Sequence, residues 1–493
     1  MNRVQEKAPL YEGLLEHINK DPLQFHIPGH KKGAGMDPDF RRFVGDNVLK
    51  MDLINIAPLD DLHHPKKIID EAQRLAAKAF GADHTFFSVQ GTSGAIMTMI
   101  MSVCGPGDKI IVPRNVHKSI MSAVIFAGAR PVFVHPEIDE AFGISHGISL
   151  EAAERALEAH PDAKAFLVIN PTYFGIAADL KRIAEAAHRY GIPVLVDEAH
   201  GVHTHFHNRL PLSAMQAGAD MSATSVHKLG GSLTQSSVLN IQGSLVQPAR
   251  VQAVISMLTT TSTSYILLAS LDTARRHLAI NGWQEIEKAL NLSTALRDQI
   301  NKIPGLSAPG KEMLNHKSRF DMDTTKVMIS VKELRITGYD AEVWLRENEN
   351  IEVELSDLYN ILVIVTPADS QETISKLASA LEHLSKKMLP SRTWVDNGAE
   401  VEVPSIPVLA YSPRDAFYAD TEEVPLHASA GRISAEFLMI YPPGIPVFIP
   451  GEIIEEENLR YIKKNMESGL PVQGLEDKSL SSIKVIRESK PII

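Results

Sequence analysis

The chain has one cysteine in 493 residues, no long apolar run and no excess of positive charge. Cys104 cannot form an internal disulfide, and no stretch approaches the roughly 18 apolar residues of a membrane-spanning helix. The first residues, Met1 to Leu10, carry charges and a proline rather than the apolar segment of a secretory leader. We therefore expect a cytoplasmic protein with no membrane contact.

The charge balance also narrows the choice of partners. A formal net charge of −11 at pH 7 disfavours nucleic acid and is compatible with a cationic substrate. Hydrophobic residues make up 44% and charged residues 22% of the chain, as in soluble globular proteins. Because 493 residues exceed one ordinary core, we expect several domains.

Strand-like and helix-like segments alternate between about residues 70 and 243. Amphipathic segments such as 150–159 and 180–190 are expected to be helices. Seven short apolar segments are expected to be strands, at residues 85–89, 109–113, 131–135, 164–169, 193–197, 221–226 and 238–243. Short buried strands with helical crossovers predict an α/β fold with a mostly parallel seven-stranded sheet.

The flanking regions have different patterns. Residues 1–60, punctuated by Gly and Pro, predict an N-terminal arm, and residues 61–310 a large domain. Strand-like segments at 326–332, 351–354 and 359–366 and an amphipathic helix at 373–388 predict a small α+β domain within residues 311–390. Residues 391–493 begin with a linker and are rich in proline, and we expect them to form a C-terminal region.

An aspartate and a lysine follow two successive predicted strands. Asp197 begins the motif Asp-Glu-Ala-His, and Lys228 ends Ser-Val-His-Lys. The carboxyl ends of strands in an open α/β sheet line one crevice, where ligands bind. Such a pair suits pyridoxal 5′-phosphate (PLP), whose aldehyde forms a Schiff base with lysine and whose ring nitrogen needs a carboxylate to stay protonated. Taken singly, Asp197 is as well explained as a helix cap and Lys228 as a solvated lysine.

Two further strand ends fit the same cofactor. Gly91-Thr92-Ser93-Gly94 precedes an apolar helix, and the N–H groups of a helix start, with the two hydroxyls, suit a phosphate. The same turn is also an ordinary helix N-cap. His117, within Arg114-Asn115-Val116-His117-Lys118-Ser119, is an aromatic ring able to stack on a pyridine, although a lone histidine at a strand end is more often structural.

A metal centre is not expected. His203, His205 and His207 alternate as they would on one face of a strand, which is a plausible ligand spacing. However, no cysteine and no second cluster accompany them.

Taken in order along the chain, these motifs resemble the Orn/Lys/Arg decarboxylase family of fold-type I PLP enzymes. Further matching segments are Phe25 to Lys31, Leu59 to His63, Asn170 to Tyr173, Tyr441 to Pro446 and Pro450 to Glu452. Within the family, the chain is similar to the compact arginine decarboxylases of bacilli. The resemblance implies a fold-type I large domain, a small domain, a C-terminal decarboxylase domain at 391–493, and a homodimer or higher homo-oligomer.

The resemblance also implies residue roles. Lys228 would hold the cofactor, Asp197 would pair with the ring nitrogen, His117 would stack on the ring and His200 would lie close to it. The phosphate would be held by Thr92, Ser93, Ser225 and His227. The Ser/Thr run at 259–264 would supply hydroxyls across a subunit boundary, or else form a hydrogen-bonded turn.

The implied reaction is decarboxylation of L-arginine to agmatine and CO₂, feeding polyamine (spermidine) biosynthesis. Lysine or ornithine decarboxylation by the same machinery is an alternative, and so is a catalytically silent PLP-fold regulator. Another fold-type I reaction, such as transamination or aldol cleavage, is a further one, because Arg414 and Arg432 could bind a substrate carboxylate. Candidate partners for a cationic side chain are Asp60, Asp61, Glu352, Glu354, Asp357 and Glu452.

Overall fold

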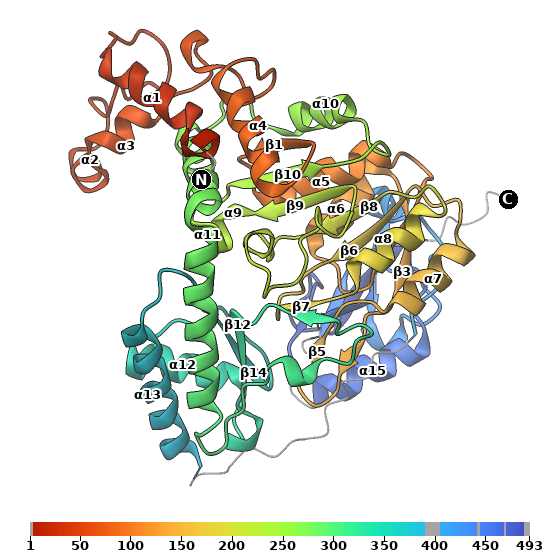
Figure 1. Cartoon of the computed structure of the whole chain (residues 1–493). Coiled ribbons are helices and arrows are strands. Elements are labelled where there is room, and N and C mark those ends of the chain that lie inside the picture. The colour runs from red at the N-terminus through yellow and green to blue at the C-terminus, as the bar shows by residue number, and fades with distance from the viewer. Residues whose placement is uncertain (1–2, 390–404, 441–443, 468–469, 488–493) are drawn as a thin grey trace, which may run out of the picture. The chain divides into compact units, whose positions relative to one another are not determined.

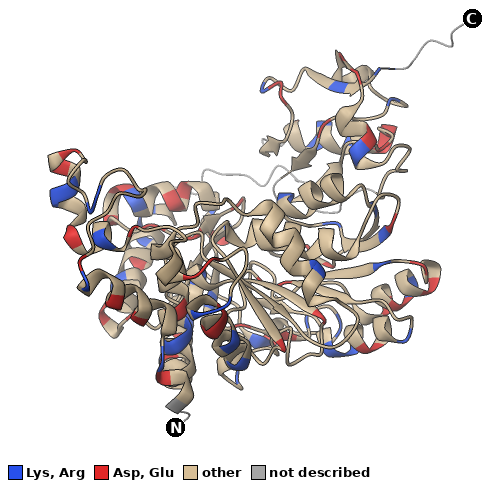
Figure 2. Ribbon diagram, turned by 90° about the horizontal axis from the view of Figure 1, so that it is seen from above, with Lys and Arg blue, Asp and Glu red and all other residues tan. Residues whose placement is uncertain are grey.

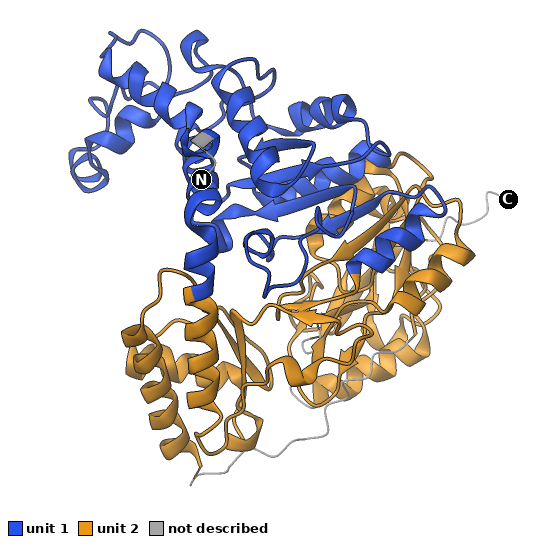
Figure 3. Cartoon of the chain, viewed as in Figure 1, with its two compact units in different colours: residues 1–103, 180–287 blue, residues 104–179, 288–493 orange. Residues whose placement is uncertain are grey.

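The computed structural model describes residues 3–389, 405–440, 444–467 and 470–487. The chain forms two compact units, which Figure 3 colours separately. Unit 1 holds residues 1–103 and 180–287, and unit 2 holds residues 104–179 and 288–493. The boundaries of the four domains expected from the sequence stay predictions. Much of the expected linker, residues 390–404, and Tyr441 to Pro443 lie outside the described residues.

Unit 1 contains the N-terminal arm and one group of strands and helices (Figure 1). Its helices are α1 (Pro9–Asn19), α2 (Pro38–Val44), α3 (Asp46–Met51), α4 (Ile68–Phe80), α5 (Gly91–Val103), α8 (Leu180–His188), α9 (Val226–Leu229), α10 (Pro248–Leu258) and the first part of α11 (Tyr265–Ile300). Its strands are β1 (His84–Ser88), β8 (Val194–Asp197), β9 (Met221–Ser225) and β10 (Ser237–Ile241).

Unit 2 contains the remaining elements. Its helices, besides the end of α11, are α6 (Lys118–Ala127), α7 (Leu150–Ala159), α12 (Gly338–Glu349), α13 (Gln371–Met388), α14 (Pro413–Tyr418) and α15 (Glu456–Glu467). The strands in its first part are β2 (Lys109–Pro113), β3 (Arg130–Val134), β4 (Ile138–Asp139), β5 (Ile144–Ser145), β6 (Ala165–Ile169) and β7 (Ile176–Ala177). The later strands are β11 (Asp321–Met322), β12 (Lys326–Ser330), β13 (Leu355–Ser356), β14 (Asn360–Ile364), β15 (Thr421–Pro425), β16 (Leu438–Ile440), β17 (Ile445–Phe448), β18 (Val472–Gln473) and β19 (Ser482–Ile486).

The main sheet has seven strands in the order β1-β10-β9-β8-β6-β2-β3. Strand β10 runs antiparallel to both β1 and β9. The pairs β8–β9, β2–β6 and β2–β3 are parallel. The prediction of a mostly parallel seven-stranded sheet is therefore confirmed.

Hydrophobic periodicity explains the helices that cover these strands. In α4 the buried residues include Ile69, Ala72, Ala76 and Phe80, which are spaced three or four residues apart as on one face of a helix. Gly81 ends this helix in the left-handed conformation, with φ +70°, which glycine adopts without steric strain.

Apolar residues between 292 and 389, here called the small region of unit 2, form one core around the sheet β12-β14-β13. Helices α12 and α13 each begin with a capping box, formed by Thr337 with Asp340 and by Ser370 with Thr373. The strand expected at 351–354 was wrong in position, since β13 covers only Leu355–Ser356.

The described C-terminal residues form a further core of their own. Strands β15 and β19 pair, and β16 lies between β17 and β18. The apolar residues of this core include Phe448, Tyr461 and Val485, and Leu358 and Tyr359 of the small region pack with them.

The N-terminal arm is joined to α11 by buried polar contacts. Asp272 Oδ2 accepts a hydrogen bond from the Leu10 N–H at 2.9 Å, and Arg275 Nη1 donates to the Gln5 carbonyl at 3.0 Å. Helix α2, by contrast, has no buried residue.

Charged residues of both signs lie mostly on helices and loops, while the strands of the main sheet are largely uncharged (Figure 2). Among the residues that the structure describes, no helix combines the length and the apolar character needed to span a bilayer.

Candidate functional site

The start of α5 offers a place for an anion. Gly91, with φ +68°, donates its N–H to the Gln235 carbonyl at 2.7 Å. The N–H groups of Thr92 and Ser93 donate no hydrogen bond to any described residue. A Cβ on Gly91 would meet nothing within 4 Å, so there is open space beside the helix start. Unpaired N–H groups and the positive end of a 13-residue helix suit a phosphate.

Three buried hydroxyls meet beside this helix start. Thr92 Oγ1 is hydrogen-bonded to Ser225 Oγ and lies 2.7 Å from Ser237 Oγ. Ser237 is opposite Ser225 in the β9–β10 register and opposite Ser88 in the β1–β10 register. Ser237 was not among the residues expected from the sequence, because only the pairing of these strands brings it to Thr92.

Two other predicted phosphate residues lie in the same unit. Ser93 is exposed in the first turn of α5. His227 Nδ1 is 3.0 Å from the carbonyl of Ser236, the residue before β10, so α9 is joined to the start of that strand.

Gln235 has φ +80°, an unfavourable conformation for a residue with a side chain, and its Nε2 donates to the Val89 carbonyl at 2.8 Å.

Lys228 and His200 are in direct contact. Lys228 is half-buried in the short helix α9, directly after β9, and its Nζ lies 2.6 Å from His200 Nε2. His200 itself is buried. The two sequence motifs are therefore brought together at the carboxyl ends of the parallel strands β8 and β9.

Asp197 is the last residue of β8 and is buried. Burial raises its pKa to about 6, while the Ala199 N–H, which donates to Oδ1 at 3.1 Å, and the charge of Lys228 act in the opposite direction. A buried carboxylate of this kind is stabilised by a cationic ligand.

The neighbouring Glu198 makes structural hydrogen bonds. Its carboxylate accepts hydrogen bonds from the Ala214 N–H at 2.7 Å and from Thr224 Oγ1 at 3.0 Å. Burial raises its pKa to about 7. It therefore ties β9 to the segment around residue 214.

His117 belongs to unit 2, where it is the N-cap of α6. Its Nδ1 accepts a hydrogen bond from the Ser119 N–H at 3.2 Å and lies 2.8 Å from Ser119 Oγ. The residue is exposed, so the capping bonds fix the orientation of the ring without burying it. Structural capping and ring stacking are thus compatible roles for this residue.

The loop before His117 rests on the β4–β5 hairpin. Asn115 Nδ2 donates to Ser145 Oγ at 3.2 Å and to the His146 carbonyl at 3.4 Å.

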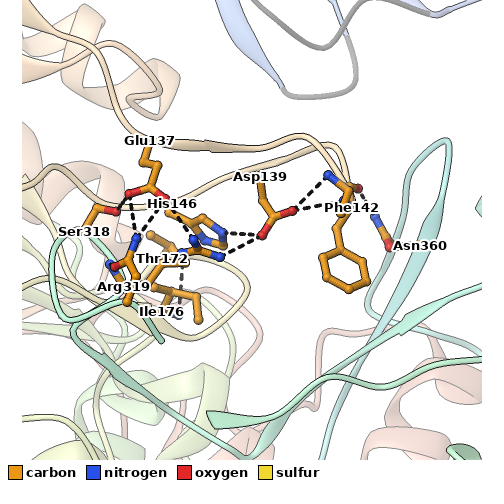
Figure 4. A network of polar contacts seen from close by, with 11 residues as sticks. Glu137, Asp139, Phe142, His146, Thr172, Ile176, Ser318, Arg319 and Asn360 are labelled. Atoms are coloured by element: carbon orange, nitrogen blue, oxygen red, sulfur yellow. Dashed lines mark hydrogen bonds and ion pairs between the residues drawn. The ribbon is translucent and has the colours of Figure 1, made fainter. Parts of the chain in front are cut away.

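This hairpin is part of a polar network, shown in Figure 4. Arg319 pairs with Glu137 at 3.2 Å and with Asp139 at 3.0 Å. Asp139 also faces the buried His146, whose hydrogen bond lowers the pKa of that carboxyl. Asn360 Nδ2 donates to the Phe142 carbonyl at 2.7 Å, so the hairpin tip contacts the start of β14.

The expected strand-like alternation of His203, His205 and His207 was wrong. The segment forms a 3-10 helix, Thr204–Phe206, so the three rings do not share one face. His205 Nδ1 is 3.0 Å from Ser213 Oγ, and His207 Nε2 is 2.8 Å from Glu287 Oε2. No group of three or more His, Cys, Asp or Glu residues suited to a metal ion occurs in the part of the chain that the structure describes.

The Ser/Thr run at 259–264 is a hydrogen-bonded turn. Thr260 Oγ1 accepts the Ser262 N–H at 3.3 Å, and Ser264 Oγ accepts the Leu267 N–H at 3.4 Å. Thr260 to Ser262 are exposed. The alternative structural role is therefore present, and a contribution to another subunit stays a prediction.

Comparison with known protein families matches residues 8–373 to "Orn/Lys/Arg decarboxylase, major domain" and residues 400–478 to "Orn/Lys/Arg decarboxylase, C-terminal domain". The chain belongs to the Orn/Lys/Arg decarboxylase family. It is 64% identical over 488 residues to an arginine decarboxylase of Bacillus subtilis, with 99% of each chain covered. It is 66% identical over 491 residues to an arginine decarboxylase of Halalkalibacterium halodurans, again with 99% of each chain covered.

Solved structures share the fold. A lysine decarboxylase of Francisella novicida has a TM-score of 0.85 at 24% identity, covering 97% of this chain and 81% of that one. The constitutive lysine decarboxylase of Escherichia coli has a TM-score of 0.82 at 21% identity, covering 98% of this chain and 82% of that one. The chain therefore shares the fold of these two proteins, in agreement with the α/β, fold-type I architecture expected from the sequence.

The residues of unit 1 fit PLP chemically. A lysine amine, a buried carboxylate and a helix start with unpaired N–H groups match the aldehyde, the ring nitrogen and the phosphate. Lys228 would hold the aldehyde carbon, Asp197 the protonated ring nitrogen, and Thr92 with Ser93 the phosphate. When bound, PLP accepts the electron pair that remains after CO₂ leaves the substrate.

Proposed function

We propose that this chain catalyses the PLP-dependent decarboxylation of L-arginine to agmatine and CO₂. The observation that carries the proposal is 64–66% identity to arginine decarboxylases over 99% of the chain, with the Lys228–His200 pair and Asp197 at adjoining strand ends. Lysine and ornithine decarboxylases are far more distant, at 26% and 25% identity. A catalytically silent regulator would have no chemical need for these side chains.

We expect Asp197, Lys228 and His200 to have different roles in this reaction. Ionised Asp197 would keep the ring nitrogen of bound PLP protonated, and Lys228 would hold the aldehyde group in the absence of substrate. His200, in contact with Lys228 Nζ, is placed to hold or accept a proton of that amine. The two arginines that left transamination open have structural roles, since Arg414 donates to the Phe126 carbonyl at 3.1 Å and Arg432 pairs with Glu422.

Three of the six carboxylates considered as partners of the substrate's cationic side chain are bound to other groups of the protein. Asp60 caps α4, accepting the Lys67 N–H at 2.7 Å. Asp357 accepts two N–H groups of its own turn, at 2.8 Å each. Glu452 is bound to Arg114.

We infer that Glu354 recognises the guanidinium group. It is exposed, and Oε1 accepts a hydrogen bond from the Tyr173 hydroxyl, which leaves Oε2 for another donor. Tyr173 follows β6, and ligands of open α/β sheets bind beyond the carboxyl ends of strands. Glu352, two residues earlier, lies 4.0 Å from Arg346 instead.

The decisive assay incubates purified protein and PLP separately with arginine, lysine and ornithine, and measures CO₂ and amine. Release of CO₂ from arginine at a kcat/KM at least tenfold above the other two supports the proposal. Equal rates, or no CO₂ from any of them, would contradict it. Glu354→Gln is expected to raise KM for arginine about tenfold, the effect of losing one charge-assisted contact, and Glu352→Gln is the matched control.

We further propose a homodimer or higher homo-oligomer, a cytoplasmic location and a role in spermidine synthesis. The first has structural support, because large apolar residues in the arm are exposed, among them Phe25 and Phe43, each 91% exposed. Cell fractionation tests the second. Loss of agmatine and spermidine in a strain lacking the protein, with rescue by added agmatine, tests the third.

A further inference from the structure

An arginine and a glutamate in unit 2 form a fully buried ion pair. Arg114 follows β2, and its Nη1 and Nη2 lie 2.6 and 2.7 Å from Glu452 Oε1 and Oε2. The two side chains are 1% and 0% exposed. The pair joins residues 338 positions apart, from the segment that carries His117 to the C-terminal region.

Other bonds complete the environment of both charges. Arg114 Nε donates to the Pro446 carbonyl at 3.0 Å, and Nη2 donates to the Val447 carbonyl at 3.3 Å. The guanidinium carbon lies 4.5 Å from the centre of the Phe133 ring. Glu452 Oε2 also accepts the Ile449 N–H at 2.9 Å. Four of the five guanidinium N–H groups therefore have acceptors in a fixed geometry.

The turn that presents Glu452 is itself tightly defined. Gly451 has φ +96°, and a Cβ at this position would lie 2.4 Å from the Tyr411 carbonyl oxygen. A side chain at residue 451 would therefore displace the turn. The C-terminal region thus offers a rigid carboxylate to Arg114.

Arg114 precedes His117 by three residues. The C-terminal region also contacts α6, the helix that His117 caps. Arg414 Nη1 donates to the Phe126 carbonyl at 3.1 Å, near the end of α6. The loop between Arg114 and His117 is also held by the Asn115 bonds to the β4–β5 hairpin.

We propose that Glu452 is a positioning residue that sets the His117 ring through Arg114. This rests on the proposed function and on the role that the family resemblance implies for His117, stacking on the cofactor ring. Without the Glu452 charge, the Arg114 guanidinium would remain buried and uncompensated, so the segment would shift to expose it to water. His117 lies three residues along the same loop, and its ring would lose the orientation needed for stacking.

The test is a double-mutant cycle on PLP affinity. Glu452→Gln is expected to raise the PLP dissociation constant about tenfold and to shift the visible absorbance of bound cofactor. In a His117→Ala background the same change is expected to alter that constant less than twofold, since the group it acts through is gone. Glu436→Gln is the control, because Glu436 accepts N–H bonds only from the described C-terminal residues Glu476 and Lys484, at 2.7 Å each.

A tenfold effect of Glu452→Gln that persists with His117→Ala overturns the proposal, and so does an equal effect of Glu436→Gln. If Glu452→Gln does not fold, Arg114→Met with Glu452→Leu removes both charges and enters the same cycle. In that variant, restored stability with weak PLP binding supports positioning, and restored binding overturns it. Wild-type protein that binds no PLP would overturn the proposed function as well, whereas an additive cycle in active protein overturns this inference alone.

Discussion

Asp197 shows how one buried residue couples stability to ligand binding. Its pKa rises from the ordinary 3.8 to about 6 because burial disfavours the charged form. The folded protein without cofactor therefore binds the proton more tightly than the unfolded chain does. Its stability must fall as the pH rises from about 4 to about 6, by at most about 3 kcal/mol from this group.

Replacing Asp197 by Asn should separate the two effects. Without PLP, the unfolding midpoint of Asp197→Asn should exceed that of wild type at pH 8, and the difference should shrink at pH 4.5. With PLP, decarboxylation should slow by roughly 10²-fold, the loss of a strong electrostatic contact. Thermal unfolding at the two pH values and initial rates check this. A difference in midpoint independent of pH would refute the burial account, and a rate within a few-fold of wild type would refute the role in catalysis.

Lys228 should be required for both the spectrum and the reaction. Lys228→Ala is expected to lose the visible absorbance of the bound cofactor and nearly all turnover, because Nζ, in contact with His200, is the amine that would bind the aldehyde. Lys78→Ala, an exposed position in α4, is the control and should leave both unchanged. Absorbance spectra and CO₂ release measure the outcome, and an active Lys228→Ala protein would remove this lysine from the mechanism.

At the scale of elements, α5, β9 and β10 meet in the contact of Thr92 with Ser225 and Ser237. Each element contributes one hydroxyl to this small group. The group lies at the helix start where a phosphate would bind, so the three elements together shape the anion site.

Thr92→Val should therefore weaken PLP binding about tenfold, the effect of one hydrogen bond to a charged group. The matched control is Thr98→Val in the same helix, because Thr98 Oγ1 is buried and donates locally to the Gly94 carbonyl at 2.9 Å. Titration of the apo-protein with PLP, alone and against inorganic phosphate, measures the difference. If both valine variants bind PLP equally well, the hydroxyl group does not belong to the phosphate site.

At the scale of the whole molecule, the N-terminal arm carries apolar surface that its own unit does not cover. Leu23, Phe25, Ile27, Phe40 and Phe43 are exposed. The arm's polar contacts with α11 hold its first residues, through Gln5, Lys7, Leu10 and Tyr11, and its last residue, since the Tyr265 hydroxyl donates to the Asp60 carbonyl at 2.7 Å. A second copy of the chain would bury such residues.

Phe25→Asp combined with Phe43→Asp should shift the protein towards monomer in sedimentation analysis and lower its activity. Tyr190→Asp, another exposed aromatic position in the same unit, should not. The expected reason is that burying two carboxylates in an apolar interface is strongly unfavourable. Wild-type protein that is an active monomer at assay concentration would exclude a shared site, and an unchanged oligomer in the double variant would place the interface elsewhere.

The sequence by itself determined the strands of the main sheet and the location of Asp197 and Lys228 at strand ends. Apolar runs of strand length between amphipathic segments were enough to locate the seven strands to within about two residues. Asp197 and Lys228 could be predicted because each follows such a run, and a strand end is a local property of the chain.

Tertiary structure decided what depends on register and on long-range pairing. Ser237 joins Thr92 only because β10 pairs antiparallel with β9. Glu452, a substrate candidate in the sequence, is bound to Arg114, far away along the chain. The histidines at 203, 205 and 207 alternate as on one face of a strand, yet Thr204–Phe206 forms a 3-10 helix, and His205 and His207 contact Ser213 and Glu287. Local patterns specify elements, whereas the partners of buried polar groups are set by segments that meet only when the chain folds.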